Sequence, residues 1–476
     1  MIDNPNMLLT ILMSVPLLGI LFSSISKESP ESNGANVLSV GILTVISNLI
    51  VLYIVGQTIN LSDSATPLLE RFEWLNTPKI EFLFTIDQFS LSLLAAVHFA
   101  ILLGLIGVRN NTYRQKTQVI FALLFLEMMT GYLLAADLFS FYIFFEAMLL
   151  PLFMLVGMMG DMHRQDILYR FFLYNLLGAS LLFMALCILF NYQNVNIQDI
   201  SKAVLSHNLE LIVWGAIFIA FLSRIPIWPF HYWISSVNVN ISNPLVFIIA
   251  NILPLTGVYG LIRFFPLTAP DIIEPYLLAL EIISIVTMVV IALIGFSNRD
   301  IHYKIFSYMT IYYILYLLGA LLPTDALLSN IGFSIFSWLI IVAAIEIIVA
   351  HLERERQQTG TSERGILTNL KKSSFILSFF VLAAVGLPLS SMFLNNMFIF
   401  AGLLTYNLKM ALFILFAIVL SSISLLQHLF YLKYSETETA ENVGSVNDIP
   451  PSVVAALSAA MVLTIISFIN PLWYME

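Results

Sequence analysis

Charged residues are scarce in this chain. Asp, Glu, Lys and Arg make up 10% of its 476 residues, whereas apolar residues make up 59%. Because an ordinary globular domain carries about 25% charged residues, this composition excludes a soluble fold and predicts a polytopic helical membrane protein. The net charge of −9 comes without a basic stripe that could neutralise phosphates, so nucleic-acid binding is not expected.

Cysteine and nucleotide-binding motifs are also lacking. The single cysteine, Cys187, excludes an internal disulfide, a cysteine-ligated iron–sulfur cluster and a zinc ribbon. None of the 7 histidines lies three or four residues from another, so a helical di-histidine metal or haem site is not expected. The chain contains no Gly-x-Gly-x-x-Gly or Walker-type loop, and we expect no nucleotide or flavin site. The N-terminus lacks a basic n-region, so the first helix is expected to be retained.

Long apolar runs are what the chain has instead. Runs of about 17–25 residues are typical of transmembrane helices. The sequence predicts about fourteen, near residues 7–25, 37–57, 89–107, 117–136, 138–159, 167–191, 210–234, 243–265, 275–296, 303–322, 327–350, 373–404, 410–432 and 452–474. The expected fold class is therefore an all-α polytopic membrane protein.

Two of the predicted helices contain motifs that break helices. The seventh contains Pro226 and Pro229, and the twelfth contains Gly386-Leu-Pro388. The two lie five helices apart, and units with an odd number of helices alternate in direction, so helices 4–8 and 9–13 would form two inverted five-helix repeats, each with one broken helix. Such repeats are typical of transporters with an ion site near the bilayer midplane. The alternative is two unrelated proline kinks, which membrane helices tolerate.

This interpretation divides the chain into four parts. Residues 1–116 would hold the first three helices, 117–265 the first repeat, 266–434 the second repeat, and 435–476 an acidic loop and the last helix. Between the second and third helices, residues 72–87 alternate weakly and are rich in aromatics, which predicts a short extracytoplasmic hairpin. The polar segment 351–372 and the acidic segment 435–448 are expected to be a solvated helix end and a loop.

The basic residues predict an orientation. Of the 20 Lys and Arg residues, fourteen follow odd-numbered helices, five lie on the other side, and Arg224 lies within a helix. Because cytoplasmic loops are rich in Lys and Arg, both termini are expected to face away from the cytoplasm or mitochondrial matrix.

A carboxylate occupies the middle of the fifth apolar run, Asp137-Leu-Phe-Ser-Phe-Tyr-Ile-Phe-Phe-Glu146-Ala-Met-Leu-Leu-Pro151. A charge at membrane depth costs roughly 2.5–3.5 kcal/mol on insertion scales, so it normally faces a partner or a hydrated cavity. We therefore interpret Glu146 as part of an ion or proton pathway. The alternative is a lone carboxyl kept neutral by burial.

At this motif the chain resembles the antiporter-like subunits of respiratory complex I, the NADH:quinone oxidoreductase, and most of all subunit M, or chain 4. Further motifs match in order: Asp87-Gln-Phe-Ser-Leu, Arg170-Phe-Phe-Leu-Tyr-Asn-Leu-Leu-Gly-Ala-Ser180, Arg224-x-Pro226-x-x-Pro229-x-His231-x-Trp233, Tyr259-Gly-Leu-Ile-Arg-Phe264 and Gly386-Leu-Pro388. The related multi-subunit sodium/proton antiporters share this fold. The resemblance implies a non-redox subunit of a proton-translocating complex, with other membrane-arm subunits as partners and no cofactor of its own.

The resemblance assigns residue roles only where positions match. Glu146 corresponds to the family glutamate that pairs with a lysine on the broken seventh helix, and that lysine position is Arg224. An arginine stays protonated and is a poor proton carrier. The family's other midplane groups are replaced by non-titrating residues: Asn238, Leu255, Ile331 and Asn396. The proton relay is therefore expected to be altered, and a channel that is degenerate as a pump stays open as an interpretation.

Four further titratable residues remain in apolar surroundings. Glu281 and Glu346 are expected to reach from near helix ends toward the interface. Glu127, deeper in the fourth helix, is a candidate for an added relay group. His231 lies beside the break, where a proton-path role and a simple hydrogen-bonded histidine are both open.

Three hypotheses follow from the sequence. The first is a subunit M-like component of a proton-pumping NADH:quinone oxidoreductase, with the proton pathway at Glu146, Arg224, His231 and Glu127 and the helix breaks at Pro226, Pro229 and Pro388. The second is a structural paralogue that seals the membrane arm without transport. The third is a subunit of a sodium/proton antiporter assembly.

Overall fold

The computed structural model describes residues 2–3, 7–26, 35–61, 68–76, 79–109, 114–159, 164–191, 197, 205–265, 270–322, 325–360, 363–368, 370–434 and 447–469. The first 434 residues contain α1 (Leu8–Ile25), α2 (Ala35–Leu61), α3 (Gln88–Gly107), α4 (Gln115–Leu134), α5 (Leu138–Ala147), α6 (Leu149–Met159), α7 (Arg164–Asn191), α8 (His207–Leu222), α9 (Tyr232–Asn240), α10 (Pro244–Phe264), α11 (Pro270–Ser297), α12 (Ile301–Leu321), α13 (Asp325–Thr359), α14 (Lys371–Val385), α15 (Ser391–Tyr406) and α16 (Leu408–Lys433). A short 3-10 helix, η3 (Ile366–Thr368), precedes α14, and α17 (Pro451–Ile469) ends the described chain.

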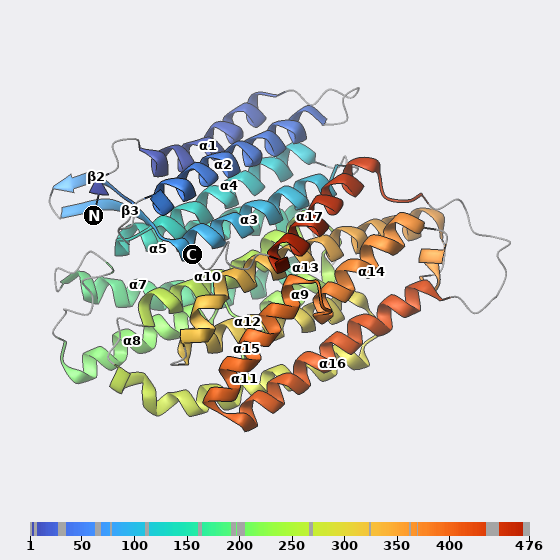
Figure 1. The fold of residues 1–476 in the computed structure, drawn as a ribbon. Coiled ribbons are helices and arrows are strands. Elements are labelled where there is room, and N and C mark those ends of the chain that lie inside the picture. Colours follow the sequence, from blue (N-terminus) through green and yellow to red (C-terminus); the bar gives the residue numbers. More distant parts are fainter. Residues whose placement is uncertain are drawn as a thin grey trace.

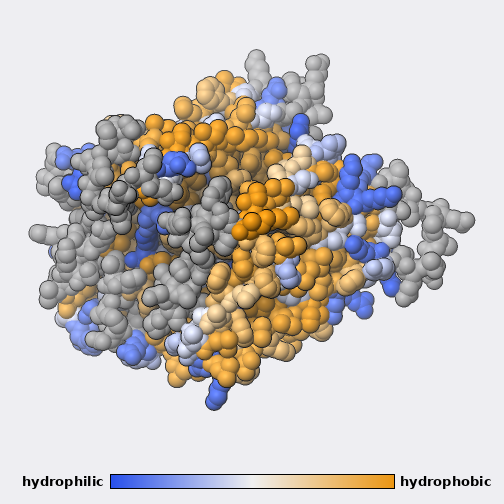
Figure 2. Space-filling model, in the orientation of Figure 1, coloured by the Kyte–Doolittle hydropathy of each residue, from blue (hydrophilic) through white to orange (hydrophobic). Residues whose placement is uncertain are grey.

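The chain is an integral membrane protein built from apolar helices. Among the described residues, 12 helical segments are long and apolar enough to cross a membrane, and two shorter apolar helices are His207–Leu222 and Ser391–Tyr406. Figure 2 shows an apolar surface over the middle of the bundle, with hydrophilic residues gathered toward its ends. The mainly helical membrane fold predicted from composition is confirmed. The four-part division of the chain remains a prediction, and residues 435–446 of the predicted acidic loop lie outside the described ranges.

The centre of the bundle is formed by α10, α12 and α13 (Figure 1). The apolar spans of α12 and α13 are entirely buried, whereas only about a third or less of those of α1, α11 and α17 is buried. Lipid offers no hydrogen bonds, so polar side chains of the membrane-embedded part collect in the interior. Accordingly, the buried face of α12 carries four tyrosines, namely Tyr308, Tyr312, Tyr313 and Tyr316.

A small sheet covers one end of the bundle (Figure 1). Strand β2 (Leu68–Asn76) pairs antiparallel with β3 (Lys79–Ile86), and β1 (Ile2–Asp3) pairs parallel with β2. This confirms the predicted hairpin. The buried Glu70 on β2 accepts hydrogen bonds from the backbone N–H groups of Leu9 and Thr10, both at 2.9 Å. The hairpin therefore supplies the cap that the first turn of α1 lacks.

The fifth predicted helix is interrupted, which the sequence interpretation missed. Helix α5 ends at Ala147 and α6 begins at Leu149, with Met148 in a turn between them. Pro151 explains the interruption, because proline has no N–H to donate to the carbonyl of residue 147 and its ring crowds that carbonyl. Glu146 therefore lies in the last turn of a short helix rather than within a continuous one.

At the opposite end of the bundle, Asp448 caps α14 from a distant part of the chain. Its carboxylate accepts hydrogen bonds from the backbone N–H of Lys372 (2.9 Å) and of Ser373 (3.0 Å). Desolvation would raise the pKa of Asp448, but these bonds and that of the Ser373 hydroxyl outweigh it and hold the pKa below its usual value.

Replacing Asp448 with alanine is expected to destabilise the protein by about 1 kcal/mol, as for the loss of a helix N-cap. Because the folded-state pKa is depressed, the contribution of Asp448 is present above the ordinary pKa of 3.8 and is lost as pH falls through the folded-state value. Thermal unfolding measured against pH checks this. Asp448→Asn keeps an acceptor without the titrating charge, so it should retain most of the stability and lose the acid dependence.

Candidate functional site

The candidate site is built around a break between α8 and α9. Helix α8 ends at Leu222, α9 begins at Tyr232, and both Pro226 and Pro229 lie in the non-helical link. Pro226 has no N–H to continue the helix. The indole Nε1–H of Trp233 donates to the carbonyl of Ser223 at 3.2 Å, which ties the far side of the link to its beginning.

Arg224 lies at the start of this link and is completely buried. Its Nη2–H donates to the carbonyl of Phe145 at 2.6 Å, and its Nη1–H to the hydroxyl of Thr256 at 3.2 Å. The guanidinium carbon lies 3.5 Å from the centre of the Phe145 ring. The last-turn carbonyls of a helix lack intrahelical donors, so the end of α5 offers a partner for a guanidinium. Three elements, α5, the link and α10, thus fix Arg224 in place.

Glu146 adjoins Phe145 and is half-buried. Its charge is near enough to interact electrostatically with that of Arg224. The two do not form an ion pair among the described side chains, so the charge pair implied by the family resemblance is not formed directly. Instead, Arg224 binds the backbone one residue before Glu146, and Oε2 of Glu146 has no partner in the described chain.

Two glycines clamp the segment that carries Arg224. A Cβ added to Gly257 of α10 would lie 2.5 Å from the carbonyl oxygen of Phe221 and 3.3 Å from Cβ of Arg224. A Cβ added to Gly178 of α7 would lie 2.9 Å from the carbonyl oxygen of Ala220. Only a residue without a side chain allows either helix to approach this closely. The position of Arg224 is therefore set by backbone contacts on two sides.

The other predicted pathway residues lie apart from this pair. Glu127 is buried in α4, and its Oε2 has no partner in the described chain. His231 lies at the end of the link, half-buried, with its ring centre 4.8 Å from that of Tyr232. Within the described ranges, no hydrogen bond or ion pair joins Glu127 or His231 to Glu146 or Arg224. Their part in a pathway remains a prediction.

Two of the four positions where the sequence departs from the family, Asn238 and Asn396, make hydrogen bonds with amides and tyrosine hydroxyls. The amides of Asn238 and Asn251 bond each other reciprocally, at 3.1 and 2.8 Å. The hydroxyl of Tyr313 donates to the carbonyl of Asn251, and that of Tyr312 donates to Asn396 at 2.8 Å. These groups do not exchange protons near neutral pH by themselves, but they bond and orient water. The network therefore supplies polar lining without titrating charge.

Asn396 lies at the second interruption. Helix α14 ends at Val385 and α15 begins at Ser391, with Pro388 between them. Gly386 closes α14 with φ 85°, a left-handed conformation that favours glycine, and a Cβ there would lie 2.7 Å from the Asn396 amide nitrogen. The hydroxyl of Tyr308 donates to the carbonyl of Ala384 at 3.1 Å, so α12 holds both sides of the break.

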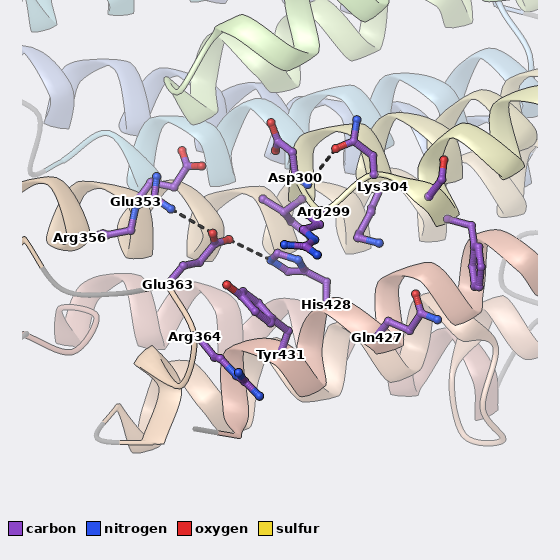
Figure 3. Close-up of a pocket in the computed structure, with 14 residues that line it drawn as sticks. Arg299, Asp300, Lys304, Glu353, Arg356, Glu363, Arg364, Gln427, His428 and Tyr431 are labelled. Carbon is purple, nitrogen blue, oxygen red and sulfur yellow. Dashed lines mark hydrogen bonds and ion pairs between the residues drawn. The ribbon is translucent and has the colours of Figure 1, made fainter. Parts of the chain in front are cut away.

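A polar cavity of about 730 Å³ opens at the end of the bundle opposite the hairpin (Figure 3). Its charged and aromatic lining comes from the start of α12, the end of α13, the turn before η3 and the end of α16, and consists of Arg299, Asp300, Lys304, Glu353, Arg356, Glu363, Arg364, His428 and Tyr431. The carboxylate of Glu363 lies between two basic side chains: its Oε2 is 3.1 Å from Nη1 of Arg356, and its Oε1 is 3.5 Å from Nε2 of His428. Burial raises the pKa of Glu363, although Arg356 opposes the effect. No local pattern of residues indicates this cavity, because its walls come from segments that are distant along the chain.

Glu346 and Glu281 are two further carboxylates, both expected from the sequence to reach toward the membrane interface. Glu346 is completely buried, thirteen residues before the end of α13, and neither carboxylate oxygen has a partner in the described chain. Glu281 is also buried and accepts a hydrogen bond from the hydroxyl of Tyr406. The prediction that Glu346 reaches toward the interface is therefore wrong, whereas for Glu281, whose partner Tyr406 ends α15, it remains a prediction. It failed for Glu346 because α13 continues to Thr359, nine residues beyond the predicted end.

Solved structures share this fold. A chain of "Respiratory complex I from Thermus thermophilus with bound NADH" is similar with a TM-score of 0.83 at 18% identity, over 98% of this chain and 97% of that chain. A chain of the Mrp complex from Dietzia sp. DQ12-45-1b gives a TM-score of 0.80 at 17% identity, over 98% of this chain and 96% of that chain.

Sequence relatives agree with the fold. NADH-quinone oxidoreductase subunit M of Rickettsia typhi is 25% identical over 439 residues, which cover 90% of this chain and 88% of the relative. NADH-ubiquinone oxidoreductase chain 4 of Arabidopsis thaliana is 27% identical over 72% of this chain and 71% of the relative. The family described as "NADH:quinone oxidoreductase/Mrp antiporter, TM" matches residues 135–422, a range that includes Glu146 and all three helix interruptions described above. The chain thus belongs to the family of membrane subunits found in NADH:quinone oxidoreductases and Mrp antiporters.

Proposed function

We propose that this chain is a subunit M-like component of the membrane arm of a proton-translocating NADH:quinone oxidoreductase. The observation that carries the proposal is the placement of Glu146 beside Arg224 at an interrupted helix in a chain of this family. A membrane-buried carboxylate next to an interrupted helix is the arrangement by which membrane transporters hold and pass ions. Glu146 gains and releases the proton, and water and the surrounding hydroxyls carry it onward.

Arg224 has a different role from Glu146 in this proposal. A guanidinium keeps its proton, so Arg224 is a fixed positive charge rather than a relay member. It favours the ionised form of Glu146 after the proton has left. Because Arg224 is held both by Phe145 of α5 and by Thr256 of α10, movement of α10 relative to α5 changes its distance from Glu146. Such movement, driven from elsewhere in the complex, is the proposed coupling step.

The proposal assigns the redox chemistry to other subunits. This chain binds no cofactor of its own, and NADH, flavin and iron–sulfur clusters belong to the hydrophilic partners. Its immediate partners are other membrane-arm subunits in a bacterial inner membrane or a mitochondrial inner membrane. Both termini face away from the cytoplasm or matrix.

Purification of the chain from its own membrane in mild detergent tests this assignment. We expect hydrophilic redox subunits to copurify, together with NADH-dependent quinone reduction. Recovery with antiporter-type membrane subunits alone, and without quinone reduction, would contradict it and support the Mrp-type assembly.

The proposed orientation makes a separate prediction. In a Cys187→Ser background, a cysteine introduced by Gln427→Cys at the cavity wall should react with a membrane-impermeant thiol reagent only from the cytoplasmic or matrix side. Phe416→Cys, on the exposed apolar face of the same helix, is the matched control and should react from neither side. Labelling of Gln427→Cys from the opposite side would show that the chain has the opposite orientation in the membrane.

A further inference from the structure

The polar cavity leads to a histidine whose two ring nitrogens have different surroundings. His302 is buried at the start of α12, and its Nε2 lies 2.9 Å from Oε1 of Glu353, which lines the cavity. Its Nδ1 is also buried and has no hydrogen-bond partner in the described part of the chain. One nitrogen thus faces a carboxylate at the cavity wall, and the other faces the protein interior.

Glu346 lies deeper on the same face of α13 as Glu353. The two residues are seven positions apart, which is two helical turns or about 10 Å. Glu346 interacts electrostatically with both His302 and Glu353. An ionised carboxylate so deeply buried without a direct partner would be costly, so the resting group is expected to carry a proton. A buried polar group without a protein partner is normally satisfied by water.

Further buried polar atoms continue inward from this point. Helix α12 packs against α13, and contacts fix the register at two places: His302 with Glu353, and Tyr316 with Ser334 at 2.9 Å. Along the stretches of α12 and α13 between these contacts, the side chains of Thr310, Ser337, Trp338 and Glu346 have buried polar atoms with no partner among the described residues. Such atoms are normally satisfied by water, so they offer sites for water molecules along the two helices.

We propose that Glu346 is a proton-accepting site, and that protons reach it from the polar cavity through Glu353 and His302. Once Glu346 has given up its resting proton, Glu353 passes a proton taken from cavity water to Nε2 of His302, and the Nδ1–H of the resulting imidazolium passes through water to the Glu346 carboxylate. Glu353 becomes a carboxylate, Glu346 becomes a carboxylic acid, and His302 returns to neutrality as the other tautomer. The cavity thus serves a second carboxylate, far along the chain from Glu146.

The charged groups around His302 are compatible with this transfer. Asp300, Glu346 and Glu353 are the charged groups that interact electrostatically with His302. Lys304 does not compete for Glu353, because its ammonium donates to the carbonyl of Gly295 at 3.3 Å and to the hydroxyl of Ser424 at 3.1 Å. Arg356 is held by Glu363 across the cavity (Figure 3). His302 is therefore the bridge between the cavity wall and Glu346.

Infrared spectroscopy of the purified protein in its complex tests the proposal. We expect the carbonyl band of a protonated carboxyl that Glu346→Gln removes. On transfer to D2O this band should shift quickly in the wild type. In His302→Leu, exchange should slow by about 100-fold, the lower end of the contribution of a positioned proton carrier. Glu281→Gln, which alters a buried carboxyl bonded to Tyr406, is the matched control and should leave the band and its exchange unchanged.

A second variant separates the loss of proton transfer from the effect of misfolding. His302→Gln offers an amide N–H to Glu353 but cannot accept a proton and pass it on. This variant should therefore fold as the wild type does, and its Glu346 carboxyl should still exchange slowly. Unchanged exchange in a folded His302 variant, or a spectrum that Glu346→Gln does not alter, would overturn the proposal. The direction of net proton flow depends on the function proposed above, whereas the exchange measurement does not. If redox subunits fail to copurify, the exchange result at Glu346 would therefore still stand. Likewise, a negative exchange result would leave the assignment to the redox complex untouched.

Discussion

Substitution of Gly257 by alanine is expected to destabilise the protein by about 1–3 kcal/mol, the usual cost of overpacking a close contact. The added Cβ would lie 2.5 Å from the carbonyl oxygen of Phe221 and 2.9 Å from Cγ1 of Ile225. The first of these atoms is backbone and cannot rotate away, so α10 and the Arg224 segment must separate. The hydrogen bond from Arg224 to Thr256, one residue before Gly257, would then be lost as well.

The measurement for Gly257→Ala is the thermal unfolding temperature in detergent, together with the amount of assembled complex in the membrane. Gly215→Ala is the matched control, because this glycine lies on α8 and a Cβ there meets nothing within 4 Å. Alanine favours a helix by up to about 1 kcal/mol over glycine, so Gly215→Ala should leave the protein as stable or more stable. Equal unfolding temperatures for Gly257→Ala and the wild type would contradict the clamp described above.

Replacing Arg263 with leucine is the second substitution with a large expected effect. The guanidinium of Arg263 lies 2.6 Å from Asp87, which also caps α3, and it donates to the hydroxyls of Tyr259 at 2.9 Å and Ser90 at 2.6 Å. Removing one partner of a buried pair costs about 3–5 kcal/mol. Because 30% and 38% of the two side chains remain exposed, solvent screening reduces this to about 1–3 kcal/mol.

The acid dependence of unfolding identifies the origin of this loss. Burial would raise the pKa of Asp87, but the charge and hydrogen bond of Arg263 outweigh it and hold the pKa below its usual value. The resulting stability is present above the ordinary pKa of 3.8 and is lost as pH falls through the folded-state value. Arg263→Leu should therefore flatten the acid limb of the stability curve. Arg71→Leu removes a mostly exposed partner of Glu81, so it should cost about 0–1 kcal/mol. Similar losses in the two variants would contradict this account.

The helices and the hairpin follow from local patterns. Apolar runs long enough to span a bilayer, and alternation around residues 72–87, are visible within a short window of sequence, and the structure has helices and strands there. The interruption at Met148 was equally local, since Pro151 is visible in the sequence. It was missed because the apolar character of the run continues across it.

The arrangement of the helices could not be predicted in this way. Among the candidate spans, Ile301–Leu321 is the least hydropathic and is entirely buried, whereas Glu274–Ser297 is the most hydropathic and is only 33% buried. This reverses the rule of soluble proteins, because lipid is as apolar as the protein interior and polar groups gather inside. Hydropathy therefore identifies membrane helices without saying which of them are central.

The site was predicted in part. Sequence patterns identified Glu146, Arg224 and the proline motifs, because a carboxylate and prolines are conspicuous in apolar runs. They did not predict that Arg224 would bind the carbonyl of Phe145 in place of the Glu146 side chain, since that depends on the end of α5. They also misplaced Glu346, whose surroundings are set by the packing of α12 against α13.

The most direct test of the central claim is the number of protons translocated per electron by vesicles that contain the complex with Glu146→Gln. Glutamine preserves size and hydrogen bonding but cannot exchange a proton. We expect fewer protons per electron than in the wild type, with unchanged assembly of the complex. An unchanged ratio in a fully assembled complex would contradict the claim that Glu146 lies on the proton route, and would leave this chain as a structural subunit of the membrane arm.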